Sequence, residues 1–91
     1  MTDHDLMIKA FGSSPVGFSP LTSGDDSQRL QVKLRIDAEF DEGDADGNVF
    51  ASHYAMGLGK DVEFNPAIPD DDLRAMKEAI FLVAVEIGRA K

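Results

Sequence analysis

Six carboxylates lie within the ten residues from position 37 to position 46, and oxygen-rich clusters of this kind can bind a hard cation such as Ca²⁺. An EF-hand loop anchored on Gly47 would begin at Glu42, but its twelfth position would be His53, where that loop requires a bidentate glutamate. We therefore expect no metal and no other cofactor. We interpret the cluster as a solvated hairpin tip or as an acidic surface that docks on a basic protein. The predicted partner-binding residues are Asp37, Glu39, Asp41, Glu42, Asp44 and Asp46.

His53 is the residue best placed for acid–base chemistry. On a strand its neighbours Ser52 and Tyr54 point to the opposite face, so adjacency alone makes no catalytic relay. We expect an ion pair of His53 with Asp37 or Glu39. The stretch "GLGK" departs from a phosphate-binding loop because an aspartate follows its lysine. These observations predict a protein that is not an enzyme.

The overall charge narrows the class of partner. The chain has 17 acidic and 9 basic side chains and a formal net charge of -8, which repels nucleic-acid phosphates and anionic membranes. There is no cysteine, the amino-terminal sequence is acidic where a signal peptide is basic, and "AIFLVAVEIG" is half the ~20 residues of a membrane span. We expect a cytoplasmic protein that contacts neither a membrane nor nucleic acid directly.

The segments that contain the acidic residues have sequence patterns typical of β-strands. Residues 6–11 predict a first strand after a frayed terminus at 1–5, and residues 12–27 form a loop rich in Gly, Ser and Pro. Within that loop, Phe18 either anchors on the core or is exposed at an interface. Strict alternation over 30–40 predicts a long strand. It leads through an acidic hairpin loop at 41–48 to a returning strand at 49–58, with Phe40 paired to Phe50 or Ser52. A short third strand follows at 61–65.

A helix is predicted over residues 70–88. Pro69 and the three aspartates that follow it favour a helix start, and apolar residues then recur at spacings of three and four. The second half of this helix is apolar on nearly all sides, although one small sheet covers only one face. We therefore expect a homodimer or higher oligomer, with contacts at Phe81, Leu82 and Val85.

Together these patterns predict a single α+β domain over residues 1–91, with a small antiparallel sheet of three to four strands packed by one C-terminal helix. The leading hypothesis for function is a small acidic protein-binding module, such as an inhibitor or adaptor of the phage or mobile-element type. One alternative is a structural subunit of a homo-oligomeric or virion-like assembly. Another is a small enzyme or metal-binding protein that uses His53 and the acidic loop.

Overall fold

The chain folds into three α-helices and one three-stranded sheet within the residues that the computed structural model describes, 1–42 and 46–91. This arrangement confirms the predicted α+β class, and the C-terminal helix packs on the sheet as expected. The elements in chain order are α1 (Asp3–Phe11), α2 (Gly24–Leu34), β1 (Asp37–Glu42), β2 (Gly47–His53), the short 3₁₀ helix η1 (Tyr54–Met56), β3 (Leu58–Phe64) and α3 (Asp71–Ala90).

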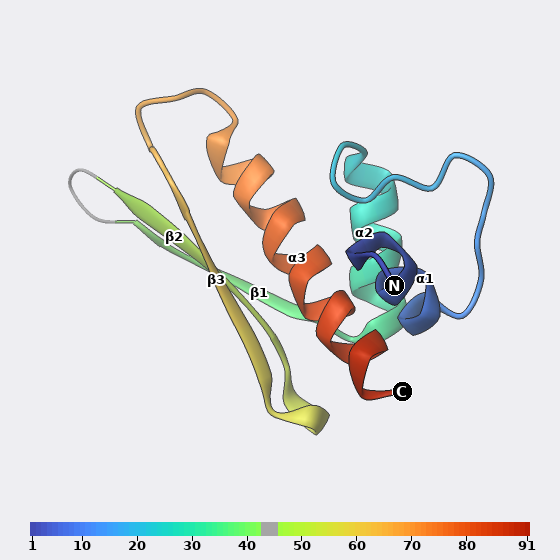
Figure 1. Cartoon of the computed structure of the whole chain (residues 1–91). Helices are drawn as coiled ribbons and strands as arrows, with labels where there is room; N and C mark the ends of the chain where they lie inside the picture. The colour runs from blue at the N-terminus through green and yellow to red at the C-terminus, as the bar shows by residue number, and fades with distance from the viewer. Residues whose placement is uncertain (43–45) are drawn as a thin grey trace.

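Helix α3 lies between two layers. The sheet has the order β1-β2-β3 with antiparallel neighbours, and it lies on one side of α3. Helices α1 and α2 lie on the other side (Figure 1). Because both sides of α3 are covered, an apolar surface around most of its circumference is buried within one chain. Its buried residues are Ala75, Ala79, Ile80, Phe81, Val83, Ala84, Val85, Ile87 and Gly88.

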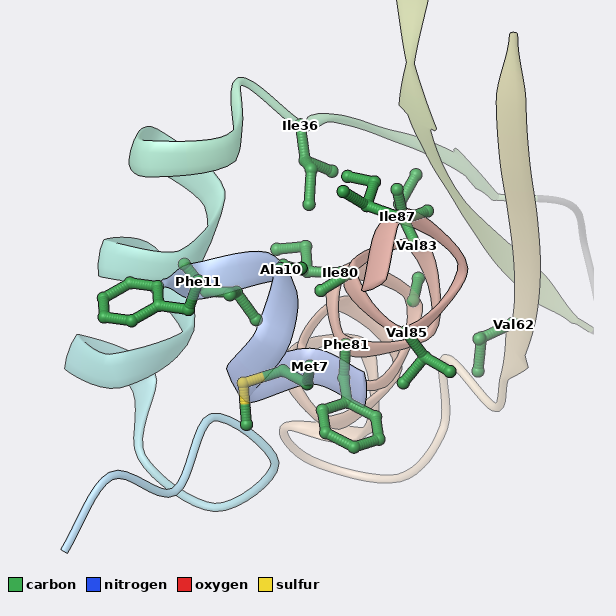
Figure 2. Close-up of a cluster of buried hydrophobic side chains, with 14 of the residues drawn as sticks. Met7, Ala10, Phe11, Ile36, Val62, Ile80, Phe81, Val83, Val85 and Ile87 are labelled. Atoms are coloured by element: carbon green, nitrogen blue, oxygen red, sulfur yellow. The ribbon is translucent and has the colours of Figure 1, made fainter. Parts of the chain in front are cut away.

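The core forms around this central helix. Figure 2 shows Met7, Ala10 and Phe11 of α1 on one side of it and Val62 of β3 on the other. Ile36, in the link between α2 and β1, closes the core at the end where the two layers meet.

The prediction of a strand at residues 6–11 was wrong, because this segment belongs to helix α1. Its first turn is fixed by a capping box. The Asp5 N–H donates to Thr2 Oγ1 (3.1 Å), and the Thr2 N–H donates to an Asp5 carboxylate oxygen (3.2 Å). Gly12 ends the helix in the left-handed conformation. The predicted frayed terminus is thus the first turn of a capped helix.

The predicted long strand at residues 30–40 was also wrong. Ser23 caps helix α2 by accepting a hydrogen bond from the Asp26 N–H (3.2 Å), and the helix ends where Arg35 adopts a left-handed conformation. Leu30 is buried, whereas Val32, which the alternation placed on the same face, is 57% exposed. The predicted loop at 12–27 is correspondingly shorter, because α2 begins at Gly24.

The hairpin register differs from the prediction by one residue. Phe40 pairs with Val49 rather than with Phe50 or Ser52. A one-residue shift exchanges the two faces of a strand, so Val49 and Ala51 face α3 and Phe50 faces away. The compact residues Val49 and Ala51 allow the helix to lie close to the sheet, and this packing outweighs the apolar character of Phe50.

Several predicted boundaries also move. Strand β1 extends to Glu42 and β2 begins at Gly47, so half of the predicted loop at 41–48 consists of strand ends. Asp44 lies outside the described residues. The third strand spans Leu58–Phe64 rather than 61–65, and the predicted helix at 70–88 spans Asp71–Ala90.

Candidate protein-binding face

The face of the sheet that points away from α3 carries a regular pattern of side chains, which we call the open face. Alternation along each strand and the cross-strand register place nine residues on it in three rows. The middle strand contributes three uncharged residues, and the outer strands contribute five carboxylates and one glycine. The rows are Asp41, Asn48 and Glu63; then Glu39, Phe50 and Asp61; then Asp37, Ser52 and Gly59.

Phe50 lies at the centre of this open face with 40% of its surface exposed. Glu39 is its partner on β1 and Asp61 is its partner on β3. The tip of its ring occupies the space above Gly59, because a Cβ atom built there would lie 2.5 Å from the ring Cζ. The glycine therefore lets the aromatic ring lean across β3 instead of standing upright from the sheet.

The five carboxylates of the open face are all exposed. Asp61 accepts a hydrogen bond from Asn48 Nδ2 at 2.8 Å, which fixes one side chain from the middle strand against β3. Among residues 1–42 and 46–91, the ion pairs involve Asp71, Glu78 and Glu86 and none of these five carboxylates. The negative charge of the open face is thus not neutralised by cations from the described part of the same chain.

The structure brings together only part of the predicted acidic cluster. Asp37, Glu39 and Asp41 share the open face, and Asp46 is exposed just before β2. Glu42 ends β1 and pairs with Gly47. Sequence reasoning missed Asp61 and Glu63, although their alternation in the third strand was a signal that could have identified them.

His53 does not form the predicted ion pair with Asp37 or Glu39. The β1–β2 ladder ends at the pair of Asp37 with Ser52, and His53 pairs with Leu58 on β3 instead. Its Nδ1 accepts a hydrogen bond from the Met56 N–H (3.2 Å), so it caps η1 at the turn between β2 and β3. Within the described residues, no group of three or more His, Cys, Asp or Glu side chains is arranged to hold a metal ion.

Phe18 lies within the core rather than at an interface. It is 7% exposed and its ring stacks on Phe11, with 4.6 Å between the ring centroids. Lys33 Nζ lies 4.4 Å from the centroid of the same Phe11 ring. Other apolar residues of the same loop are not buried: Val16 is fully exposed and Leu21 is 45% exposed.

The surface predicted for self-association is covered within the chain. Phe81 and Val85 are 7% and 3% exposed, and Leu82 is partly buried. Figure 2 shows Phe81 on the side of α3 toward Met7 and Val85 on the side toward Val62. The prediction was wrong about what covers this surface, because it treated α1 as a strand and so left the second side of α3 without a partner.

Comparison with known proteins does not assign this chain to a family. No family model matches the chain, and no curated protein or solved structure matches it. In the described part of the chain, no helix has both the length and the apolar character that crossing a bilayer requires.

Proposed function

We propose that this protein is a non-enzymatic binding module that docks the open face of its sheet on a basic surface of another protein. The observation that supports the proposal most is the arrangement of five exposed carboxylates on the two outer strands around the exposed ring of Phe50. The absence of cysteine suits a reducing compartment, so we place the complex in the cytoplasm.

The electrostatic part of this proposal depends on the sign of the charges on the open face and on their positions. Like charges on one face repel an acidic surface and attract a basic one, which favours one class of partner and speeds the encounter. Each carboxylate interacts with a cation ~7 Å away by roughly 0.6 kcal/mol in water, before screening by salt. Several such pairs together are sufficient for a measurable preference.

The apolar part of the proposal concerns Phe50. Aromatic residues near the centre of an interface contribute disproportionately to affinity once surrounding groups exclude water. Phe50 occupies such a central position, with charged residues at the margins on β1 and β3. A partner with lysine or arginine side chains around an apolar contact would match this pattern, and cations can also interact with the ring face.

The test is a nuclear magnetic resonance titration with a blocked peptide of three Arg-Gly repeats as the probe. We expect chemical-shift changes concentrated on the open face. The triple variant Glu39→Gln, Asp61→Asn and Glu63→Gln should weaken binding about tenfold at low salt, because it removes three of the five charges.

A second triple variant serves as the control. Asp3→Asn, Asp25→Asn and Asp72→Asn alter three exposed carboxylates outside the sheet, and either triple changes the formal net charge from -8 to -5. Binding by this control should stay within about twofold of the parent protein. If both triples weaken binding equally, net charge rather than the open face governs binding and the proposal fails.

A further inference from the structure

Strand β1 is an edge of the sheet. It pairs with β2 on one side, and within residues 1–42 and 46–91 no strand pairs with its other side. An exposed edge presents backbone N–H and C=O groups that can accept another strand. The side chains beside this edge therefore determine what kind of strand would fit.

The helix-facing side of β1 is only partly covered. Helix α3 packs chiefly on β2 and β3, where Val49, Ala51, Val62 and Phe64 are buried. Phe40 points to the same side from β1 and is 51% exposed. Its ring meets Phe64 edge to face, with 6.4 Å between centroids, and the rest of the ring is open. Ala38 precedes it on the same side and is partly buried.

The two sides of this edge thus differ in chemistry. Ala38 and Phe40 offer an apolar surface on the helix side, and Asp37, Glu39 and Asp41 offer three carboxylates on the open face. A strand added beside β1 alternates its own side chains between the same two sides. The complementary strand therefore has apolar residues alternating with lysine or arginine.

We propose that β1 accepts an extended segment of the protein partner as a fourth strand, with basic side chains on the open face and apolar side chains beside Phe40. This inference rests on the proposed function, since it specifies how a basic partner engages the acidic sheet. Backbone pairing would supply affinity, and the alternating side chains would supply specificity.

Charge disfavours a second copy of this chain as an antiparallel added strand. If two β1 strands paired antiparallel about Glu39, carboxylates of one copy would lie opposite carboxylates of the other on the open face. Like charges directly opposite each other destabilise a strand pair. A basic segment of another protein meets attraction at the same positions.

Strand β3 is less suited to the same role. Its apolar residues Val62 and Phe64 are already buried under α3. Lys60 is on the same side, and its Nζ lies 3.9 Å from Glu86 Oε1. An additional strand there would gain little further apolar burial, whereas a strand beside β1 would cover the open part of the Phe40 ring.

Two peptides of identical composition test the proposal. The first is a blocked heptapeptide with four arginines alternating with three valines, and the second has the three valines together between pairs of arginines. The alternating peptide should bind about tenfold more tightly and should slow hydrogen exchange at amides of β1. N-methylation of the peptide backbone on its paired edge should abolish this advantage, because it removes the donors that a ladder needs.

A variant of the protein gives an independent measurement. Phe40→Ser should weaken binding of the alternating peptide about five- to tenfold and leave the other peptide within about twofold, because only a paired strand covers the ring. Val32→Ser, which alters an exposed apolar residue on α2, should change neither affinity. Circular dichroism of each variant establishes that it is folded.

The outcomes separate this inference from the proposed function. If both peptides bind the open face with equal affinity and the triple variant Glu39→Gln, Asp61→Asn and Glu63→Gln weakens both, docking on the open face stands and strand addition is overturned. If neither peptide perturbs the open face, both proposals are overturned. Slowed exchange at β3 instead of β1 would also overturn the assignment of the edge.

Discussion

Replacing Gly88 by alanine should destabilise the fold much more than one added methyl group suggests. Gly88 is buried on α3 where α1 crosses it, and the backbones of the two helices are in close contact there. A Cβ atom at position 88 would lie 1.8 Å from the Leu6 carbonyl oxygen and 2.6 Å from its carbonyl carbon. Both neighbours are backbone atoms of a helix, so no side-chain rotation can relieve the overlap.

The cost follows from how far α1 must move. Ordinary contact begins near 3.4 Å, so the two helices would have to separate by about 1.6 Å. A gap of that size removes more than half of the dispersion attraction across the contact. The α1 side of the core consists of Leu6, Met7, Ala10 and Phe11. We expect a loss of roughly 3 to 5 kcal/mol from this surface, offset by about 1 kcal/mol because alanine favours a helix interior over glycine.

The assay is urea unfolding followed by circular dichroism. Gly88→Ala should lower the free energy of unfolding by about 2 to 4 kcal/mol and the melting temperature by roughly 10 to 20 °C. Gly24→Ala is the matched control, because a Cβ atom at that position in α2 meets nothing within 4 Å, and its effect should stay within about 0.5 kcal/mol. If Gly88→Ala instead raises stability by about 1 kcal/mol, helix propensity alone acts at this site, and the close crossing of α1 and α3 is refuted.

Three further substitutions test other parts of the structure. Ser27→Ala should leave stability unchanged or raise it by up to about 1 kcal/mol in the same urea assay, because the buried Ser27 hydroxyl has no hydrogen-bond partner among the described residues; a marked loss would contradict this. Gly47→Ala should cost about 1 to 3 kcal/mol, since its Cβ would lie 2.3 Å from the buried ring of Phe64, and an unchanged unfolding midpoint would argue against that packing. A hydrogen bond from Arg74 Nε (2.7 Å) holds the pKa of Asp71 below its ordinary value. The resulting stabilisation is present above the unfolded pKa of about 3.9 and is lost as pH falls through the lower folded pKa. Unfolding at pH 6 and pH 2.5 should therefore show the difference between the parent protein and Asp71→Asn shrinking at low pH, whereas a constant difference would exclude the linkage.

Helix α3 was predictable because two independent signals agree. Asp71 and Asp72 lie in its first turn, where carboxylates favour helix initiation, and the apolar spacing of three and four continues to Ile87. Pro69 lies before the helix and its N-cap, Asp70. Its burial on both sides was also readable from the sequence. What covers the second side was not, because that depends on recognising α1.

The amino-terminal half was predicted incorrectly because alternation was given more weight than capping. The pattern from Leu30 onward fits a strand, but Leu30 and Leu34 are also one helical turn apart, and Ser23 with Asp26 forms a helix start. In α1, Thr2 and Asp5 carry a similar local signal. In both segments a short polar motif next to an ambiguous apolar pattern determined the secondary structure.

The open face was only partly predictable because it combines strands that are far apart in sequence. The acidic alternation of Asp37, Glu39 and Asp41 is visible in one segment, but joining it to Asp61 and Glu63 requires the register of two strand pairs. That register depends on which side of β2 faces α3. Pairing apolar residues across the hairpin favoured Phe50 as the buried residue of β2. Packing against a close helix favours Val49 and Ala51 instead.

The central position of α3 also affects how the chain folds during synthesis. Both the sheet and α1 pack on a helix that begins only at Asp71, so they lack their main packing surface while the ribosome is still making the preceding segments. The contact between Leu6 and Gly88 joins residues near opposite ends of the sequence, so forming it closes a long loop at an entropic cost. A nascent chain that lacks α3 therefore exposes the apolar residues of its hairpin and of α1, and chaperones that recognise such segments have the longest opportunity to bind before α3 emerges.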